Sequence, residues 1–256
     1  QLEKYGAKVY NQYADLEAWD GTILKARNII GAFNPDNKKR VMLCAHWDSR
    51  PYADYDADEK NHKKPIDGAN DGASGVGVLL EIARQIQKEA PSIGIDIIFF
   101  DAEDYGTPAW HRGSYKPHDW CLGSQYWGRT PHVPSYFARY GILLDMVGGK
   151  GGTFYYEPYS YRTARKEVKK IWNKAHELGY GSFFVKQEGS EVTDDHVYVN
   201  QLARIPCVDI INFDPVYENS SFGPTWHTVN DNISNIDRNT LKAVGQTVMD
   251  VIYNEK

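Results

Sequence analysis

Three apolar runs in this chain end at a histidine or an acidic residue, and this pattern constrains the fold more than any other feature. Each run is short, and all of its residues except Asp96 are apolar, as expected for a strand buried on both faces. The runs are residues 41–45 before His46, residues 95–100 before Glu103 and Asp104, and residues 142–144 before Asp145. Because the carboxyl ends of strands in an open α/β sheet converge on one crevice, we expect these side chains to meet there.

Two further segments carry side chains of the same kind. Residues 67–75 (DGANDGASG) contain Asp71 just before a strongly helical stretch, and residues 222–227 (FGPTWH) end in His227. Imidazole and carboxylate ligands suit zinc, and a catalytic zinc commonly has three protein ligands and one open position. We therefore predict that Asp71, Asp104 and His227 bind zinc.

Each of these ligands also has a purely structural interpretation. Asp71 could cap the helix that follows it, Asp104 could lie in a turn, and a histidine such as His227 is often solvated or hydrogen-bonded without a metal. The prediction of a metal site therefore depends on the coincidence of all these groups beside strand ends.

Glu103 directly precedes a predicted ligand, so we expect its carboxylate to point to a different side of the metal and to be free for proton transfer. A carboxyl group that exchanges protons near neutral pH needs a raised pKa, which neighbouring acids can provide. Asp145 and Asp194 are the candidates for this supporting role.

Strand and helix patterns alternate along the chain, which predicts an α/β fold. We expect one domain over residues 1–256, with a largely parallel, twisted central sheet and helices on both faces. The predicted strands are residues 27–33, 40–45, 94–100, 141–147, 153–156 and 205–213. The predicted helices are residues 3–19, 74–88, 161–178 (with Ser160 as N-cap) and 240–253.

Two long segments, residues 49–66 and 105–134, fall outside these elements. Long loops in a compact domain are usually functional or mobile, and these two follow metal-bearing strands. We therefore expect them to form the mouth of the site, with Trp110 as a candidate substrate contact. Packing of their aromatic residues onto the sheet is an equally good explanation for most of these side chains.

The composition excludes several classes of protein. The formal net charge is −5 and the pI is about 5.9, which argues against binding to nucleic acid or to an anionic membrane. No stretch approaches the roughly 20 apolar residues that a transmembrane helix requires. Three cysteines form no disulfide framework. The chain begins at Gln1 rather than methionine, which suggests a trimmed or a mature form, so any signal peptide would already be gone.

The motifs resemble those of the zinc-dependent M28 aminopeptidase superfamily, and within it the animal-type (type II) glutaminyl cyclases, especially their bacterial relatives. The resemblance extends from about Val41 to the C-terminal helix. The motifs that carry it are HWDS at residues 46–49, GAND at 68–71, FFDAED at 99–104, LLD at 143–145, DDH at 194–196 and residues 222–227.

This resemblance implies a zinc aminopeptidase-like α/β-hydrolase topology and one zinc ion held by Asp71, Asp104 and His227. It also implies a hydrogen-bonded acidic network and a substrate pocket. The network is Glu103, Asp145 and Asp194, and the pocket residues are Trp226 and Phe222. The expected reaction converts N-terminal glutamine, and more slowly glutamate, of peptides and proteins to pyroglutamate. A periplasmic or secreted location is expected on the same basis.

A di-zinc M28 aminopeptidase is the alternative, with His46 and Asp145 on the second ion and Asp71 bridging both. Two features favour the cyclase: Asp194 is an extra acid that could hold Asp145 by a shared proton, and Trp226 adds an aromatic wall. Two features depart from the animal pattern. Asp104 is shorter than the glutamate usual there, and Asp209 stands where the animal pattern has a histidine.

Overall fold

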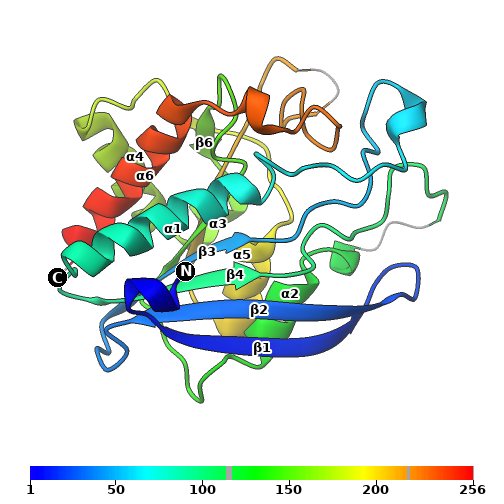
Figure 1. Ribbon diagram of the computed structural model, residues 1–256. Coiled ribbons are helices and arrows are strands. Elements are labelled where there is room, and N and C mark those ends of the chain that lie inside the picture. Colours follow the sequence, from blue (N-terminus) through cyan, green and yellow to red (C-terminus); the bar gives the residue numbers. More distant parts are fainter. Residues whose placement is uncertain (114–116, 218–219, 256) are drawn as a thin grey trace.

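A central six-stranded sheet organises the protein, seen here in a computed structural model that describes residues 1–113, 117–217 and 220–255 (Figure 1). The strand order is β1-β2-β4-β3-β5-β8. Strands β4, β3, β5 and β8 are parallel, whereas β1 and β2 form an antiparallel hairpin along one edge. The strands are β1 (Lys8–Glu17), β2 (Ile23–Phe33), β3 (Arg40–His46), β4 (Gly94–Phe100), β5 (Gly141–Asp145) and β8 (Cys207–Ile211). The prediction of an α/β fold is confirmed, with a mixed sheet.

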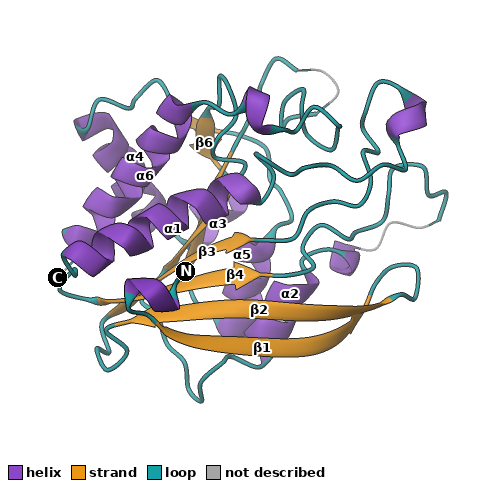
Figure 2. Ribbon diagram, in the orientation of Figure 1, coloured by secondary structure: helices purple, strands orange, loops and turns teal. Residues whose placement is uncertain are grey.

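Helices cover both faces of this sheet (Figure 2). On β3, Val41 and Leu43 face one hydrophobic core, and Met42 and Cys44 face the other. Alternate residues of a strand point to opposite faces, so one apolar run serves both cores. The first core packs against α1 (Ala73–Lys88), α4 (Arg165–Glu177) and α6 (Arg238–Tyr253), and the second against α2 (Leu122–Arg129). The remaining α-helices are α3 (Pro158–Thr163) and α5 (Asp195–Tyr198), which continues into a π-helix at Val199–Ala203, and a small second sheet consists of β6 (Phe154–Tyr156) and β7 (Phe184–Glu188).

The predicted helix at residues 3–19 is wrong. A short 3-10 helix, Glu3–Tyr5, is followed by strand β1, which pairs with β2 from Lys8 opposite Ala32 to Glu17 opposite Ile23. The side chains of β1 alternate in exposure, which is the period of a strand. Pairing along ten residues with a long partner strand therefore outweighs the weak helical spacing of the apolar residues.

The predicted helix at residues 161–178 is two helices, α3 and α4, and the predicted cap is also wrong. Helix α3 starts earlier because Pro158 fits its first turn and the Glu157 carboxylate accepts hydrogen bonds from two backbone N–H groups there. The Ser160 hydroxyl instead accepts a hydrogen bond from the Asp209 N–H group at 3.0 Å.

The other predicted strands and helices are present with small shifts at their ends. Helix α2 lies inside the segment 105–134, where no helix was predicted. Helix α5 and strand β7 were also not predicted. Across the described residues, no helix is both long and apolar enough to span a membrane.

Candidate active site

The three predicted metal ligands come together at the carboxyl edge of the sheet. Asp71 lies just before α1, Asp104 follows β4, and His227 belongs to the loop that precedes α6. The His227 Nε2 atom is 3.2 Å from Asp104 Oδ1 and 3.6 Å from Asp71 Oδ2. All three side chains are buried, and Asp71 Oδ2 and Asp104 Oδ2 have no hydrogen-bond partner within the described part of the chain. The three groups could hold a cation between them.

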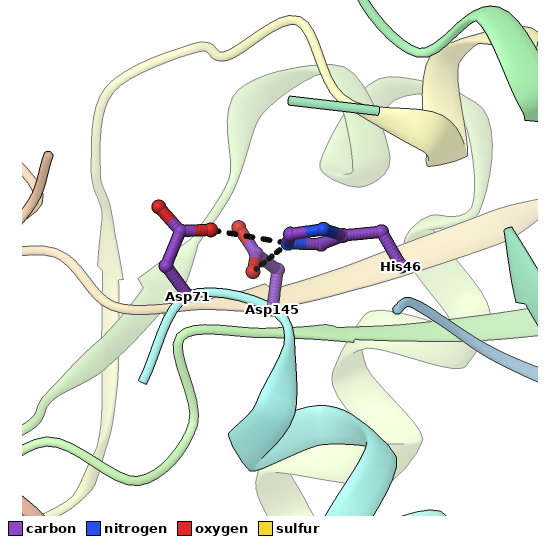
Figure 3. Close-up of side chains that lie close together, drawn as sticks. All are labelled: His46, Asp71 and Asp145. Carbon is purple, nitrogen blue, oxygen red and sulfur yellow. Dashed lines mark hydrogen bonds and ion pairs between the residues drawn. The ribbon is translucent and has the colours of Figure 1, made fainter. Parts of the chain in front are cut away.

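A second triad, His46, Asp71 and Asp145, lies beside the first and shares Asp71 with it (Figure 3). The His46 Nε2 atom is 3.1 Å from Asp71 Oδ1 and 3.2 Å from Asp145 Oδ1. Burial lowers the pKa of His46, but hydrogen bonds to Asp145, Asp48 and Asp71 outweigh this effect and raise the pKa well above its usual value. Asp71 thus directs one carboxylate oxygen to each histidine.

Glu103 lies in the loop after β4, and Asp48 fixes this loop. The two Asp48 oxygens accept hydrogen bonds from the N–H groups of Glu103 and Asp104 at 3.1 and 3.0 Å. Burial raises the pKa of the Glu103 carboxyl well above its usual value; the charge of His46 opposes this, and the nearby Asp104 and Asp194 carboxylates add to it. Glu103 therefore has the raised pKa that a proton-transfer group needs near neutral pH.

Asp194 and Asp145 belong to the same buried acidic cluster. Burial, followed by repulsion from Asp145, raises the pKa of Asp194 to about 7, and burial also raises the pKa of Asp145. Asp194 Oδ1 accepts the Asp195 N–H group at 2.5 Å, and Asp194 Oδ2 has no partner among the described residues. Asp145 is hydrogen-bonded to His46, and the described contacts include no direct bond between Asp145 and Asp194.

These groups open into a pocket of about 590 Å³, which is the size of many small-molecule sites. Trp226 and Phe222 both line it, with ring centroids 4.8 Å apart, and Tyr55 packs against Trp226 at 4.4 Å. Trp226 also stacks on the predicted ligand His227 at 3.8 Å. The pocket therefore has an aromatic wall that also supports a ligand.

Trp110 is not among the residues that line this pocket. Its ring lies 5.0 Å from that of Tyr52 and stacks against His62, with 38% of its surface exposed. Trp120, from the same loop, lines the pocket instead and lies parallel to the His227 ring at 6.0 Å. The aromatic loop does reach the site, through a different tryptophan.

The backbone at the site is strained. Four of the seven non-glycine residues with positive φ among the described residues lie there: Ala102, Cys121, Met146 and His227. Positive φ is unfavourable for residues with a Cβ atom and persists where the surrounding contacts enforce it. Of these four, Met146 and His227 line the pocket, and Ala102 directly precedes Glu103, which also lines it.

Sequence reasoning missed Arg50 and Asp54, which are fully or almost fully buried behind His227. Arg50 donates two hydrogen bonds to Asp54, both at 2.7 Å, and a third to the Asp104 carbonyl oxygen at 2.8 Å. Asp54 Oδ1 lies 3.4 Å from His227 Nδ1. A carboxylate behind the second nitrogen of a ligand histidine fixes its tautomer and orientation. In the sequence, the one indication of this ion pair is that Arg50 and Asp54 have opposite charges and lie four residues apart within a loop.

The model for peptidase family M28 matches residues 28–252, which include all the residues of the pocket and both triads. The chain belongs to peptidase family M28. The resemblance inferred from the motifs is therefore confirmed at the level of the family.

Two solved structures are very similar to this M28 chain. One is a glutaminyl cyclase of Bacteroides thetaiotaomicron bound to N-acetylhistamine, with a TM-score of 0.97 and 62% identity. The other is a leucine aminopeptidase precursor of Bacteroides thetaiotaomicron VPI-5482, with a TM-score of 0.96 and 61% identity. Each similarity covers 100% of this chain and 86% of the other.

A curated relative, the glutaminyl-peptide cyclotransferase of Bos taurus, is 29% identical over 251 residues. The similarity covers 84% of this M28 chain and 62% of the bovine protein. The chain thus spans less than two thirds of the length of that relative.

Proposed function

We propose that this M28 chain is a zinc-dependent glutaminyl-peptide cyclotransferase. Its substrates would be peptides and proteins with N-terminal glutamine, and more slowly glutamate. Both would give pyroglutamyl peptides, with release of ammonia from glutamine and of water from glutamate. The similarity to a solved bacterial glutaminyl cyclase and to the bovine cyclotransferase supports this assignment. A periplasmic or secreted location is part of the proposal, and cell fractionation would test it.

The residues of the first triad fit zinc. Asp71 Oδ2 and Asp104 Oδ1 lie near one imidazole nitrogen of His227. Asp71 Oδ2 and Asp104 Oδ2 are buried and have no hydrogen-bond partner among the described residues. An anionic oxygen that is buried without a partner is costly, and a cation offsets that cost. One nitrogen and two oxygen ligands leave an open position, as in catalytic zinc sites. When bound there, zinc would act as a Lewis acid on the side-chain carbonyl group of the substrate.

The chain's own residues then account for the proton movements. The pocket holds the glutamine bent, so that its α-amine reaches its own side-chain carbonyl carbon. As the new C–N bond forms, Glu103 accepts a proton from the amine. Glu103 then gives this proton to the side-chain nitrogen, and the old C–N bond breaks to release ammonia. Trp226 and Phe222 would exclude water from the folded side chain.

The observation that carries the assignment is Asp194. This acid lines the pocket and is almost completely buried, yet neither ligand triad uses it. With a pKa of about 7 it is partly protonated at neutral pH, and one of its oxygen atoms lies within 4.8 Å of a Glu103 oxygen. Cyclisation needs such a proton-sharing cluster and consumes no water, so a second metal with a bound nucleophile is unnecessary.

A di-zinc aminopeptidase is the second candidate, because His46, Asp71 and Asp145 also lie close enough to hold an ion. The experiment is to incubate the zinc-loaded protein with a peptide that begins with glutamine and with leucine amide, and to measure products by mass spectrometry. We expect a loss of 17 Da from the glutamine peptide, roughly the mass of ammonia, and no hydrolysis of leucine amide. Hydrolysis of leucine amide without cyclisation would assign the chain to the peptidases.

A further inference from the structure

Cys121 stands at the start of α2, and its backbone fixes it beside the loop that carries Glu103. Its N–H group donates a hydrogen bond to the Glu103 carbonyl oxygen at 2.9 Å, and the next N–H group, of Leu122, donates to the Ala102 carbonyl oxygen at 2.9 Å. Both Cys121 and Ala102 have positive φ, at 57° and 54°. Two strained backbone segments are thus joined at the point where the Glu103 side chain leaves the main chain.

The thiol of Cys121 also contacts the Glu103 carboxyl group. The Sγ atom lies 3.2 Å from Glu103 Oε1, within hydrogen-bonding distance for sulfur. Among the residues that the structure describes, this is the one hydrogen bond assigned to the Glu103 side chain. Burial and the nearby Glu103 carboxylate raise the pKa of the Cys121 thiol well above its usual value. The thiol therefore stays protonated and can act as a hydrogen-bond donor.

A carboxyl group in this position needs a fixed orientation, because one oxygen must reach both the attacking amine and the leaving nitrogen. A wrong rotamer of the proton carrier would lower the rate without affecting substrate binding. Cys121 is fully buried, so it has no exposed surface for reaction with solutes. Its contact with Glu103 is the feature that distinguishes it from the other buried cysteines, Cys44 and Cys207.

We propose that Cys121 is a positioning residue for Glu103. Its thiol donates to Oε1, holds the carboxyl group in one rotamer and leaves Oε2 for the reacting nitrogen. This inference rests on the proposed function insofar as Glu103 is the proton carrier. The same positioning would apply if the carboxyl group served a peptidase reaction.

Variants at residue 121 test the donor separately from the packing. Cys121→Ala removes the donor without a β-branched side chain at this positive φ, whereas Cys121→Ser keeps a donor. We expect Cys121→Ala to lower kcat about tenfold or more, with KM and zinc content nearly unchanged, and Cys121→Ser to recover to within about threefold of the wild type. The matched control is Cys44→Ala, which removes a buried thiol that contacts the Ile142 carbonyl oxygen instead, and it should keep wild-type kcat.

Two outcomes would overturn the proposal. If Cys121→Ala keeps wild-type kcat, the thiol does not position Glu103. If the Ser and Ala variants lose kcat equally, residue 121 does not act as a hydrogen-bond donor. If the wild-type protein does not cyclise N-terminal glutamine, the proposed function is wrong. The variants are then compared on the reaction that the wild type does catalyse.

A measurement that needs no activity covers the case in which Cys121→Ala does not fold. In a variant with Cys44→Ala and Cys207→Ala, Cys121 is the sole thiol. We expect the Raman S–H stretch of this variant to lie at the low frequency of a hydrogen-bonded thiol, and to move to higher frequency when Glu103→Leu is added. A stretch that does not change on this substitution would show that no such hydrogen bond exists.

Discussion

The two ligand triads contain the same types of residue and share Asp71, yet their surroundings differ. In the first, His227 is backed by the buried Asp54–Arg50 ion pair, and two carboxylate oxygens have no hydrogen-bond partner among the described residues. In the second, His46 Nε2 lies within 3.2 Å of a carboxylate oxygen on each of its two acids. Asp48 Oδ1 lies 3.5 Å from His46 Nδ1, but Asp48 is held by two backbone N–H groups instead of an arginine. The inventory of ligands alone therefore does not distinguish the triads.

This comparison indicates that the charged groups around the ligands, and not the types of ligand, distinguish the two triads. Arg50 fixes Asp54 with two hydrogen bonds, and Asp54 fixes the imidazole of His227. Beside the second triad, burial and repulsion from Asp145 raise the pKa of Asp194 to about 7, so this acid is partly protonated at neutral pH. We infer that the first triad binds the ion and that the second belongs to the proton-sharing network.

The strongest test of this difference replaces each histidine in turn. His227→Asn should lose zinc and nearly all activity, because a catalytic zinc site usually needs all three of its protein ligands. His46→Asn, the matched control in the other triad, should keep close to one zinc per chain. Elemental analysis after dialysis measures both. Loss of bound zinc from both variants would show that the two triads are equivalent.

The next largest effect is expected at Glu103. Glu103→Gln should keep its zinc but lose about 10²–10⁴-fold in kcat, because an amide cannot accept and return the proton. Glu81→Gln, the same change on an exposed face of α1, should have no effect. Steady-state kinetics checks both variants. Retention of more than about a tenth of wild-type kcat would assign the proton transfer to another group.

Removal of the Asp54 charge behind His227 should have a smaller effect, which would be measured as a lower affinity for zinc. Asp54→Asn keeps the shape of the side chain but removes the charge that faces His227 Nδ1, so we expect affinity to fall about 10–100-fold. Competition with a chromogenic chelator measures this change. Asp58→Asn, on an exposed turn of the same loop, is the control. Equal affinity in the wild type and Asp54→Asn would show that the ion pair has only a structural role.

The smallest expected effect is at the aromatic wall. Trp226→Ala should lose about 2 kcal/mol of transition-state stabilisation, or roughly 30-fold in kcat/KM, and Trp226→Phe clearly less. Zinc content should stay close to one per chain in both variants. Because Trp226 also stacks on His227, parallel loss of zinc and activity would assign it to ligand support instead of substrate contact.

Much of the site could be predicted because its main residues follow strands that are visible in the sequence. His46, Asp104 and Asp145 come directly after or close to the ends of buried apolar runs, and parallel pairing of β3, β4 and β5 brings those ends together. The N-terminal strand could not be predicted in this way, because it is amphipathic and its conformation depends on pairing with β2.

The supporting residues could not be predicted for a related reason. Arg50, Asp54 and Cys121 lie in loops, and their roles depend on contacts with residues such as His227 that are distant in the sequence. Local patterns contain no information on such contacts. Trp110 and Trp120 illustrate the same limit: both belong to one aromatic loop, and tertiary packing decides which of them lines the pocket.

The number of zinc ions bound per chain tests the central claim most directly. Protein saturated with zinc and then freed of excess metal by gel filtration can be measured by mass spectrometry under native conditions. We predict one zinc per chain in the wild type, and also in Asp194→Asn, which should lose activity because the acidic cluster loses its shared proton. Two zinc ions in the wild type, together with hydrolysis of leucine amide, would contradict the account and make the second triad a metal site.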